Sequence, residues 1–225
     1  MVASLYVFVN GIFMFELRPF VTFLIPTLGR KSLNRAITSL KLQTDSNWSA
    51  IVMFDGLSCP RSLSKKVRFL QYKKQRGAGG VRNRMLEILY KKEPLLPQWV
   101  AFLDDDDHLK ETYVERLREY ACKGDEVVLF SHRIKRGLIP RRGTTKIACM
   151  NVGISYAVRM DFLTRVQPLF REKKEMEDCH FVKACQNAGA KVFITHDEQY
   201  MCPGRRSRWR KPKPGEFYRN EIKLL

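Results

Sequence analysis

Four consecutive aspartates, Asp104 to Asp107, directly follow the apolar segment Trp99–Leu103. Two carboxylates ~4 Å apart repel each other by about 4 kcal/mol at an effective dielectric constant of about 20. A run of four at the end of a buried strand therefore needs a cation, a basic partner or a protonated member. A hard divalent metal ion meets that need through carboxylate oxygens.

The backbone decides which of these aspartates act together. If the chain stays extended, Asp104 and Asp106 lie on one side, and Asp105 and Asp107 lie on the other. The alternative without a ligand is a solvated acidic turn that caps a helix beginning near Lys110. Because ligands bind at the carboxyl ends of strands in open α/β sheets, the position favours metal or nucleotide binding.

A glycine-rich segment, Arg76–Arg84 (RGAGGVRNR), opens a helical stretch. Backbone N–H groups at a helix start, together with Arg82, can bind an anion. The glycines at 77, 79 and 80 do not form GxGxxG, and no GK[ST] follows them. Dinucleotide binding and P-loop phosphotransfer are therefore disfavoured.

Apolar segments of strand length alternate with helical ones. We expect strands at Val21–Ile25, Trp48–Phe54, Val67–Tyr72 and Trp99–Leu103, and helices at Leu33–Leu42 and Val81–Lys92. In a second section we expect a helix at Glu111–Cys122, a strand at Val127–Ser131, a basic loop at Arg133–Arg142, a β segment near Ile147–Val158, a helix near Glu177–Ala188 and a strand-like segment at 191–195. The alternation predicts an α/β fold with a mostly parallel sheet flanked by helices.

Four motifs agree in order and spacing with one known family: FLIPTLGR at 23–30, IVMFDG at 51–56, GAGGVRNRML at 77–86 and FLDDDDHL at 102–109. Together they resemble the family 2 glycosyltransferases of the GT-A fold. Farther on, NVGISYAVRMDFL at 151–163 is similar to the acceptor-side segment of that family, and EMEDCHFVKACQNAG at 175–189 is similar to its Glu-Asp helix.

The resemblance implies a GT-A (Rossmann-like) domain over residues 20–203, with a nucleotide-binding part at about 20–110 and a smaller, mixed acceptor part at about 111–203. It also implies a nucleotide-sugar donor, with a UDP-sugar as the default. Phe54 stands where many members carry another acidic residue, which leaves the identity of the base open.

The same resemblance implies a set of site residues. The donor-binding residues would be Pro26, Thr27, Arg30, Asp55, Gly77, Arg82, Asn83, Asp104 and Asp105, with Arg206 of the basic C-terminal tail (residues 204–225) closing over the diphosphate. The metal ligands would be Asp106, Asp107 and His196, holding Mn²⁺ or Mg²⁺. A lone histidine after a strand is otherwise a hydrogen-bonded surface residue, and the tail is otherwise a solvated basic segment.

Glycosyl transfer also needs a base for the acceptor hydroxyl. The family resemblance places a carboxylate at the start of the acceptor-side helix, where EMED offers Glu175, Glu177 and Asp178. We expect Asp178 to be the base in an inverting reaction, with Glu177 as the neighbouring candidate. The alternative role is the ordinary pairing of acidic groups with a helix N-terminus.

The chain has 225 residues, and 41 Lys and Arg against 23 Asp and Glu give a net charge of 41 − 23 = +18. Its hydrophobic content of 44% excludes a disordered chain, and its charge favours polyanionic partners. Expected partners are a nucleotide-sugar donor, a glycan, glycoprotein or glycolipid acceptor, and an anionic membrane surface. A nucleic-acid-binding protein is the alternative from another class, although the four aspartates disfavour it, and a metal-dependent nucleotidyltransferase is a third.

The N-terminal segment and the cysteines indicate in which cellular compartment the protein is expected. In the N-terminal extension, residues 1–19, the apolar stretch Val2–Phe15 is shorter than a membrane-spanning helix requires and is interrupted by Asn10 and Gly11. Translation from Met14 is an equal alternative. The six cysteines are scattered without CxxC pairs, so we expect neither a disulfide framework nor a structural zinc site. We expect a cytoplasmic protein, with membrane association as the further option.

Overall fold

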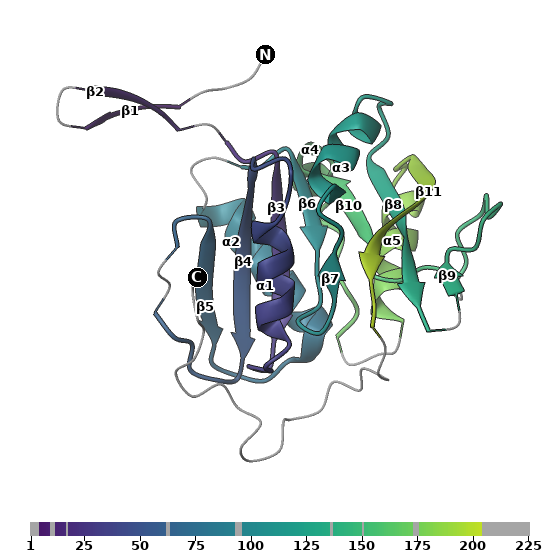
Figure 1. Cartoon of the computed structure of the whole chain (residues 1–225), viewed down its shortest axis with the longest axis horizontal. Helices are drawn as coiled ribbons and strands as arrows, with labels where there is room; N and C mark the ends of the chain where they lie inside the picture. The colour runs from purple at the N-terminus through teal and green to yellow at the C-terminus, as the bar shows by residue number, and fades with distance from the viewer. Residues whose placement is uncertain are drawn as a thin grey trace.

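The computed structural model describes residues 5–9, 12–16, 18–61, 64–92, 96–135, 137–149, 151–172 and 176–203 (Figure 1). The basic tail with Arg206, and Glu175 before the last helix, lie outside these ranges. In the N-terminal extension, β1 (Leu5–Val9) and β2 (Ile12–Glu16) pair antiparallel as a separate sheet. Among the described helices, none has the length and apolar character to cross a bilayer.

The main sheet contains nine strands of the described chain, in the order β5-β4-β3-β6-β10-β8-β11-β7 with β9 beside β8. Its parallel half consists of β3 (Val21–Thr27), β4 (Trp48–Asp55), β5 (Val67–Tyr72) and β6 (Trp99–Phe102). Its mixed half consists of β7 (His108–Leu109), β8 (Val127–Ile134), β9 (Gly137–Ile139), β10 (Tyr156–Arg159) and β11 (Val192–Met201). A parallel half joined to a mixed half agrees with the predicted α/β fold and its mostly parallel sheet.

Helices cover both faces of this sheet. They are α1 (Leu33–Lys41), α2 (Gly77–Lys92), α3 (Tyr113–Ala121), α4 (Met160–Val166) and α5 (Glu177–Asn187). The chain passes from β3 through α1 to β4 in one direction and from β5 through α2 to β6 in the other. Right-handed crossovers in opposite directions put α1 and α2 on opposite faces, as Figure 1 shows.

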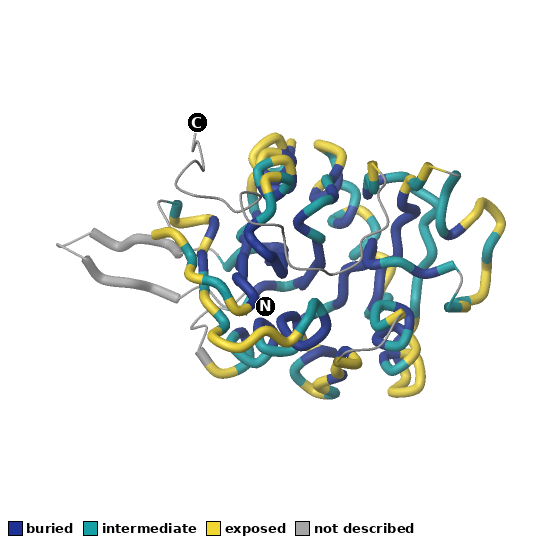
Figure 2. Tube along the Cα trace, turned by 90° about the horizontal axis from the view of Figure 1, so that it is seen from below, coloured by how far each residue is buried: buried dark blue, intermediate teal, exposed yellow. Residues whose placement is uncertain are grey.

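The core explains why these segments fold as they do. All seven positions of β3 are buried, which is typical of a strand covered on both faces. In α1 the buried apolar residues Leu33, Ala36, Ile37 and Leu40 recur at helical spacing. Figure 2 shows buried strands at the centre and exposed loops at the periphery. Strand order reverses between β3 and β6, so their carboxyl ends open the crevice in which ligands bind in such folds.

Several elements of the second section differ from the sequence prediction. The basic loop 133–142 contains β9, which forms a hairpin with β8. The β segment expected near Ile147–Val158 is limited to β10, and α4, which follows it directly, was not predicted. The strand expected at 191–195 continues to Met201, because β11 pairs with β8 up to Met201 and its last residues also pair with β7. Such pairings between distant segments leave no local pattern in the sequence.

Cys149 and Cys179 form a disulfide that joins the loop before β10 to the first turn of α5. The expectation of no disulfide framework from scattered cysteines therefore missed this bridge. The two residues are 30 positions apart, and only the fold brings them together. Cys59, Cys122, Cys185 and Cys202 are free thiols.

Candidate active site

The four aspartates form a turn at the carboxyl end of β6. The N–H of Asp107 donates to the carbonyl oxygen of Asp104 at 3.2 Å, so the extended arrangement, with side chains alternating from one residue to the next, is wrong. The chain must turn here because β7 begins at His108 and pairs with the end of β11. The Tyr200 hydroxyl accepts the N–H of Asp104 at 3.0 Å, and the Arg35 guanidinium donates to the Asp106 carbonyl.

Three of these carboxylates come together on one side of the turn. Asp104, Asp106 and Asp107 each offer an oxygen, and these oxygens lie within 4.8 Å of one another. Burial raises the pKa of Asp107 to about 8, and repulsion from Asp104 and Asp106 adds to the rise. Burial and Asp104 likewise raise the pKa of Asp106. A cluster of hard oxygen ligands that is costly to ionise without a cation fits a divalent metal ion.

Asp105 points the other way and is held by the end of β3. Its carboxylate accepts the Thr27 hydroxyl at 2.7 Å, the Leu28 N–H at 3.3 Å and an Arg30 N–H at 3.0 Å. Burial raises the pKa of Asp105 to about 6, although Arg30 and Thr27 act in the opposite direction. Arg30 also reaches Asp106 at 3.4 Å, so it links Asp105 to the cluster of Asp104, Asp106 and Asp107.

Arg82 joins the acidic turn to α5. Its guanidinium contacts Asp104 at 2.5 Å and Glu177 at 3.0 Å, and the residue is 1% exposed. Burial alone would lower the pKa of Arg82, but Asp104 and Glu177 raise it above its ordinary value. The side chain is therefore a fixed cation between two carboxylates that lie 177 − 104 = 73 positions apart in sequence. It brings the sequence-predicted donor and acceptor regions to one place.

Asp178 lies beside this arginine in the first turn of α5. One of its oxygens accepts the N–H of Cys179 at 2.8 Å. Burial raises its pKa to about 6, with Glu177 adding to the rise and Arg82 opposing it. A carboxyl group that changes protonation near neutral pH is suited to accept a proton. Glu177, in contrast, is already engaged by Arg82.

Asp55 and the glycine-rich segment meet at the start of α2. The Asp55 carboxylate accepts the N–H groups of Arg76 and Gly77 at 2.8 and 2.9 Å, and the residue is 1% exposed. Gly77 is the first residue of α2. The Asp55 carboxylate therefore binds two N–H groups at the start of this helix. The open anion site expected at the glycine-rich segment is to that extent already filled.

The glycines and Asn83 also hold a distant segment against α2. A Cβ atom at Gly79 would come within 2.6 Å of the Arg171 carbonyl oxygen, so only glycine fits this approach. The Asn83 amide donates to the Phe170 carbonyl at 2.9 Å and accepts the Phe170 N–H at 2.8 Å. Asn83 therefore orders the segment before α5.

Two other predicted residues lie apart from the acidic turn. Pro26 is buried within β3, opposite Met53 of β4. His196 lies in β11 with φ 56°, where the pairing with β8 is irregular, and it is not part of the three-aspartate cluster. The structure brings the three aspartates together without this histidine.

Three residues near the turn were not anticipated from the sequence. Besides Tyr200, the Cys202 thiol donates to Asp107 at 3.3 Å. His132 packs against Gly153, where a Cβ atom would come within 2.3 Å of the ring, and its Nδ1 lies 3.2 Å from the Ser155 hydroxyl. Burial lowers the pKa of His132 to about 4. No motif marked these positions, because β8 and β11 bring them to the turn from distant parts of the chain.

Comparisons with known proteins identify the family and the fold of the chain. A model of the family described as glycosyl transferase family 2 matches residues 22–182. The crystal structure of S. aureus TarS 1–349 superposes on this chain with a TM-score of 0.63 at 18% sequence identity. The match covers 80% of this chain and 59% of the TarS chain. The same TarS fragment in complex with UDP-GlcNAc is 19% identical with a TM-score of 0.62, covering 82% of this chain and 58% of that one.

A third structure, TarS 1–349 in complex with UDP, has a TM-score of 0.63 at 17% identity and covers 80% and 59% of the two chains. The chain thus spans less than two thirds of the TarS chains it matches. No curated protein matches its sequence. At such identities the likeness shows the fold, and the expected GT-A-like fold is confirmed.

Proposed function

The chain belongs to glycosyl transferase family 2, and on that premise we propose that it transfers a sugar from a UDP-sugar to an acceptor hydroxyl with inversion at the anomeric carbon. The complexes of TarS with UDP and UDP-GlcNAc support a uridine donor for a chain of this fold. The acceptor is a glycan, a glycoprotein or a glycolipid. Because the described residues contain one acidic metal-type cluster, they do not favour a nucleotidyltransferase with two metal sites.

Asp104, Asp106 and Asp107 would hold Mn²⁺ or Mg²⁺, since their oxygens converge and burial disfavours their ionisation without a cation. The bound ion supplies positive charge against the negative charge that develops on the departing diphosphate. From the family resemblance we propose His196 as a further ligand, although it lies outside the three-aspartate cluster. Arg30 and Arg82 add fixed cations beside the cluster.

The donor-binding residues proposed from the family resemblance fall into two groups. Thr27, Asp55, Asn83 and Asp105 are hydrogen-bonded within the protein, and with Pro26 and Gly77 we propose that they shape the nucleotide pocket. Arg30 and Arg82 contact the metal cluster, and we propose that they bind the diphosphate of the donor, whereas Asp104 would bind the donor as a member of that cluster. Arg206 is proposed to contact the diphosphate from the C-terminal tail.

The base is Asp178. It takes the proton of the acceptor hydroxyl while the oxygen bonds to the anomeric carbon, and the bond from that carbon to the diphosphate oxygen breaks. The departing diphosphate keeps the electron pair, and no covalent enzyme intermediate forms. Glu177 is bound to Arg82, and its neighbour Asp178 has a pKa of about 6, which together favour Asp178 over Glu177.

The observation that carries this proposal is the Arg82 bridge between Asp104 and Glu177. It brings the metal-ligand turn and the start of the acceptor-side helix to one guanidinium, as a transfer between donor and acceptor requires.

Thermal shift with a panel of UDP-sugars, each with Mn²⁺ or with EDTA, tests the proposal. A donor that binds the native state raises the melting temperature, and we expect that increase only with Mn²⁺. Equal stabilisation in EDTA would show that the donor binds without metal. No stabilisation by any UDP-sugar would contradict the uridine donor.

A further inference from the structure

A cavity lies at the amino ends of the parallel strands, on the side of the sheet opposite the acidic turn. It has a volume of about 570 Å³. Phe20, which precedes β3, Trp99 at the start of β6 and Arg159 at the end of β10 line it, together with the last turn of α3. The amino ends of β3 and β6 therefore face this cavity, whereas their carboxyl ends face the acidic turn.

The lining is apolar at its base. Phe20, Trp99 and Met160 are each 3% exposed, and Leu96 and Pro97 complete this part of the wall. A cavity of this size with an apolar base accepts an organic group and not merely a small ion.

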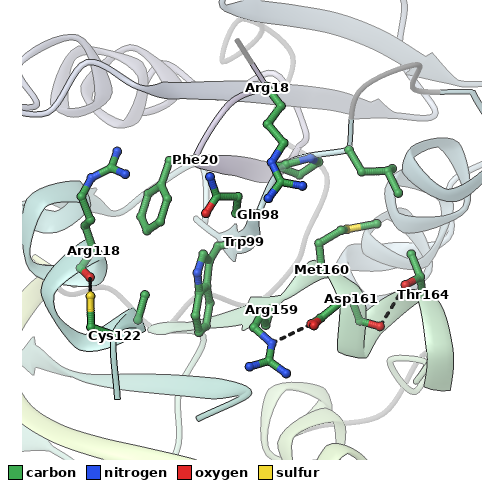
Figure 3. Close-up of a pocket in the computed structure, with 13 residues that line it drawn as sticks. Arg18, Phe20, Gln98, Trp99, Arg118, Cys122, Arg159, Met160, Asp161 and Thr164 are labelled. Carbon is green, nitrogen blue, oxygen red and sulfur yellow. Dashed lines mark hydrogen bonds and ion pairs between the residues drawn. The ribbon is translucent and has the colours of Figure 1, made fainter. Parts of the chain in front are cut away.

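Three arginines surround that base, as Figure 3 shows for Arg18, Arg118 and Arg159. Arg118 pairs with Asp45 at 2.8 Å and lies over the Phe20 ring at 4.0 Å. Arg159 contacts Asp161 at 2.6 Å. These two guanidinium groups are therefore already neutralised by carboxylates of the protein.

Arg18 differs from both. Within the described residues it has no carboxylate partner, and its buried Nε atom has no hydrogen-bond partner. A buried donor left unpaired is costly, and an anion in the cavity would satisfy it. A guanidinium fork matches the oxygens of a phosphate group.

We propose that this cavity binds a phosphate monoester with an apolar body, its phosphate on Arg18 and its apolar part on Phe20, Trp99 and Met160. Arg118 and Arg159 add positive potential at the rim without losing their own partners. The ligand is either a lipid headgroup with its adjoining chains or a soluble phosphorylated amphiphile. The site is separate from sugar transfer, because it lies at the other edge of the sheet.

Isothermal titration calorimetry with hexyl phosphate and with inorganic phosphate tests the proposal on the full chain. We expect hexyl phosphate to bind about tenfold more tightly or better, because only it fills the apolar base. In Arg18→Gln the affinity for hexyl phosphate should fall about tenfold or more, and Arg18→Lys should restore only part of it. Arg165→Gln is the matched control, since Arg165 is exposed in neighbouring α4 and does not line the cavity.

Equal losses in Arg18→Gln and Arg165→Gln would overturn the proposal, because the attraction would then come from the general charge of the surface. Equal affinities for hexyl phosphate and inorganic phosphate would overturn the proposed binding of an apolar group by Phe20, Trp99 and Met160. If neither phosphate binds, the whole proposal is overturned. Sedimentation with phosphatidylcholine vesicles, with and without phosphatidic acid, separates the two sources. Binding that depends on phosphatidic acid and Arg18 identifies a lipid headgroup, and hexyl phosphate binding without vesicle binding identifies a soluble ligand.

Discussion

Two groups of carboxylates lie at the carboxyl edge of the sheet and differ in what neutralises them. Asp55 and Asp105 accept hydrogen bonds from backbone N–H groups, a hydroxyl and a guanidinium of the protein. The Asp104, Asp106 and Asp107 cluster is instead crowded against itself. The first group stabilises the loops of the site. The second has fewer cations than carboxylates, because Arg82 on Asp104 is shared with Glu177 and Arg30 on Asp106 is shared with Asp105, so a metal ion would balance the remaining charge.

The largest effect is expected at the self-crowded cluster. Asp106→Asn keeps the shape of the side chain but removes one anionic oxygen, so sugar transfer with Mn²⁺ should fall by roughly 10²–10³-fold. Its melting temperature without metal should not fall, because the substitution also removes a repulsive charge. Asp125→Asn, in the loop between α3 and β8, is the control and should keep full activity. Full activity of Asp106→Asn at ordinary Mn²⁺ would remove this residue from the metal site.

Asp178→Asn should reduce turnover by ~10²-fold while donor and metal affinities stay near wild type. A base must be deprotonated, so wild-type turnover should rise with pH through about 6, and this step should be absent from the residual activity of the variant. Glu177→Gln is the neighbouring control. It should weaken the contact to Arg82 without removing the pH step. A pH step lost in Glu177→Gln and kept in Asp178→Asn would assign the base to Glu177.

Deprotonation of Asp178, which should raise turnover as the pH rises, should lower the stability of the folded protein. The folded-state pKa of Asp178, about 6, lies above the ordinary 3.8, so the folded protein holds the proton more tightly than the unfolded chain. The stability that this proton contributes is present below pH ~4 and is lost as the pH rises through ~6. Asp178→Asn does not titrate, so its melting temperature should rise relative to wild type by ~5–10 °C between pH 4 and pH 8, since the pKa difference corresponds to about 2–3 kcal/mol. A constant difference across this range would contradict the raised pKa.

The sequence predicted the parallel half of the fold well and the contacts between distant segments poorly. Buried β3 and amphipathic α1 follow from local patterns, and the strand-end rule placed Asp104 to Asp107 at the ligand-binding edge. The sequence offered an acidic turn only as an alternative to an extended chain, and it could not decide between them because the turn depends on the pairing of β7 with β11. The Arg82–Glu177 pair and the Cys149–Cys179 bridge likewise join residues that no motif connects.

The smallest effect is expected at Asp55, one of the two carboxylates that accept hydrogen bonds from the protein itself. Asp55 accepts two N–H groups at the start of α2, and asparagine offers one acceptor oxygen where the carboxylate offers two. Asp55→Asn should therefore lower the free energy of unfolding by about 1 kcal/mol, the usual scale of a helix N-terminal cap. If the carboxylate acts by ordering α2, the affinity for UDP in the presence of Mn²⁺ should change little once the variant is folded.

Chemical denaturation and calorimetric titration with UDP measure these two quantities separately. A variant with unchanged stability and UDP affinity reduced by about tenfold would make Asp55 a direct nucleotide ligand, since losing a charge-assisted hydrogen bond costs about that much. Asp55 would then both accept hydrogen bonds within the protein and bind the nucleotide. A stability loss with intact UDP affinity would instead show that its carboxylate is already used by the N–H groups of Arg76 and Gly77.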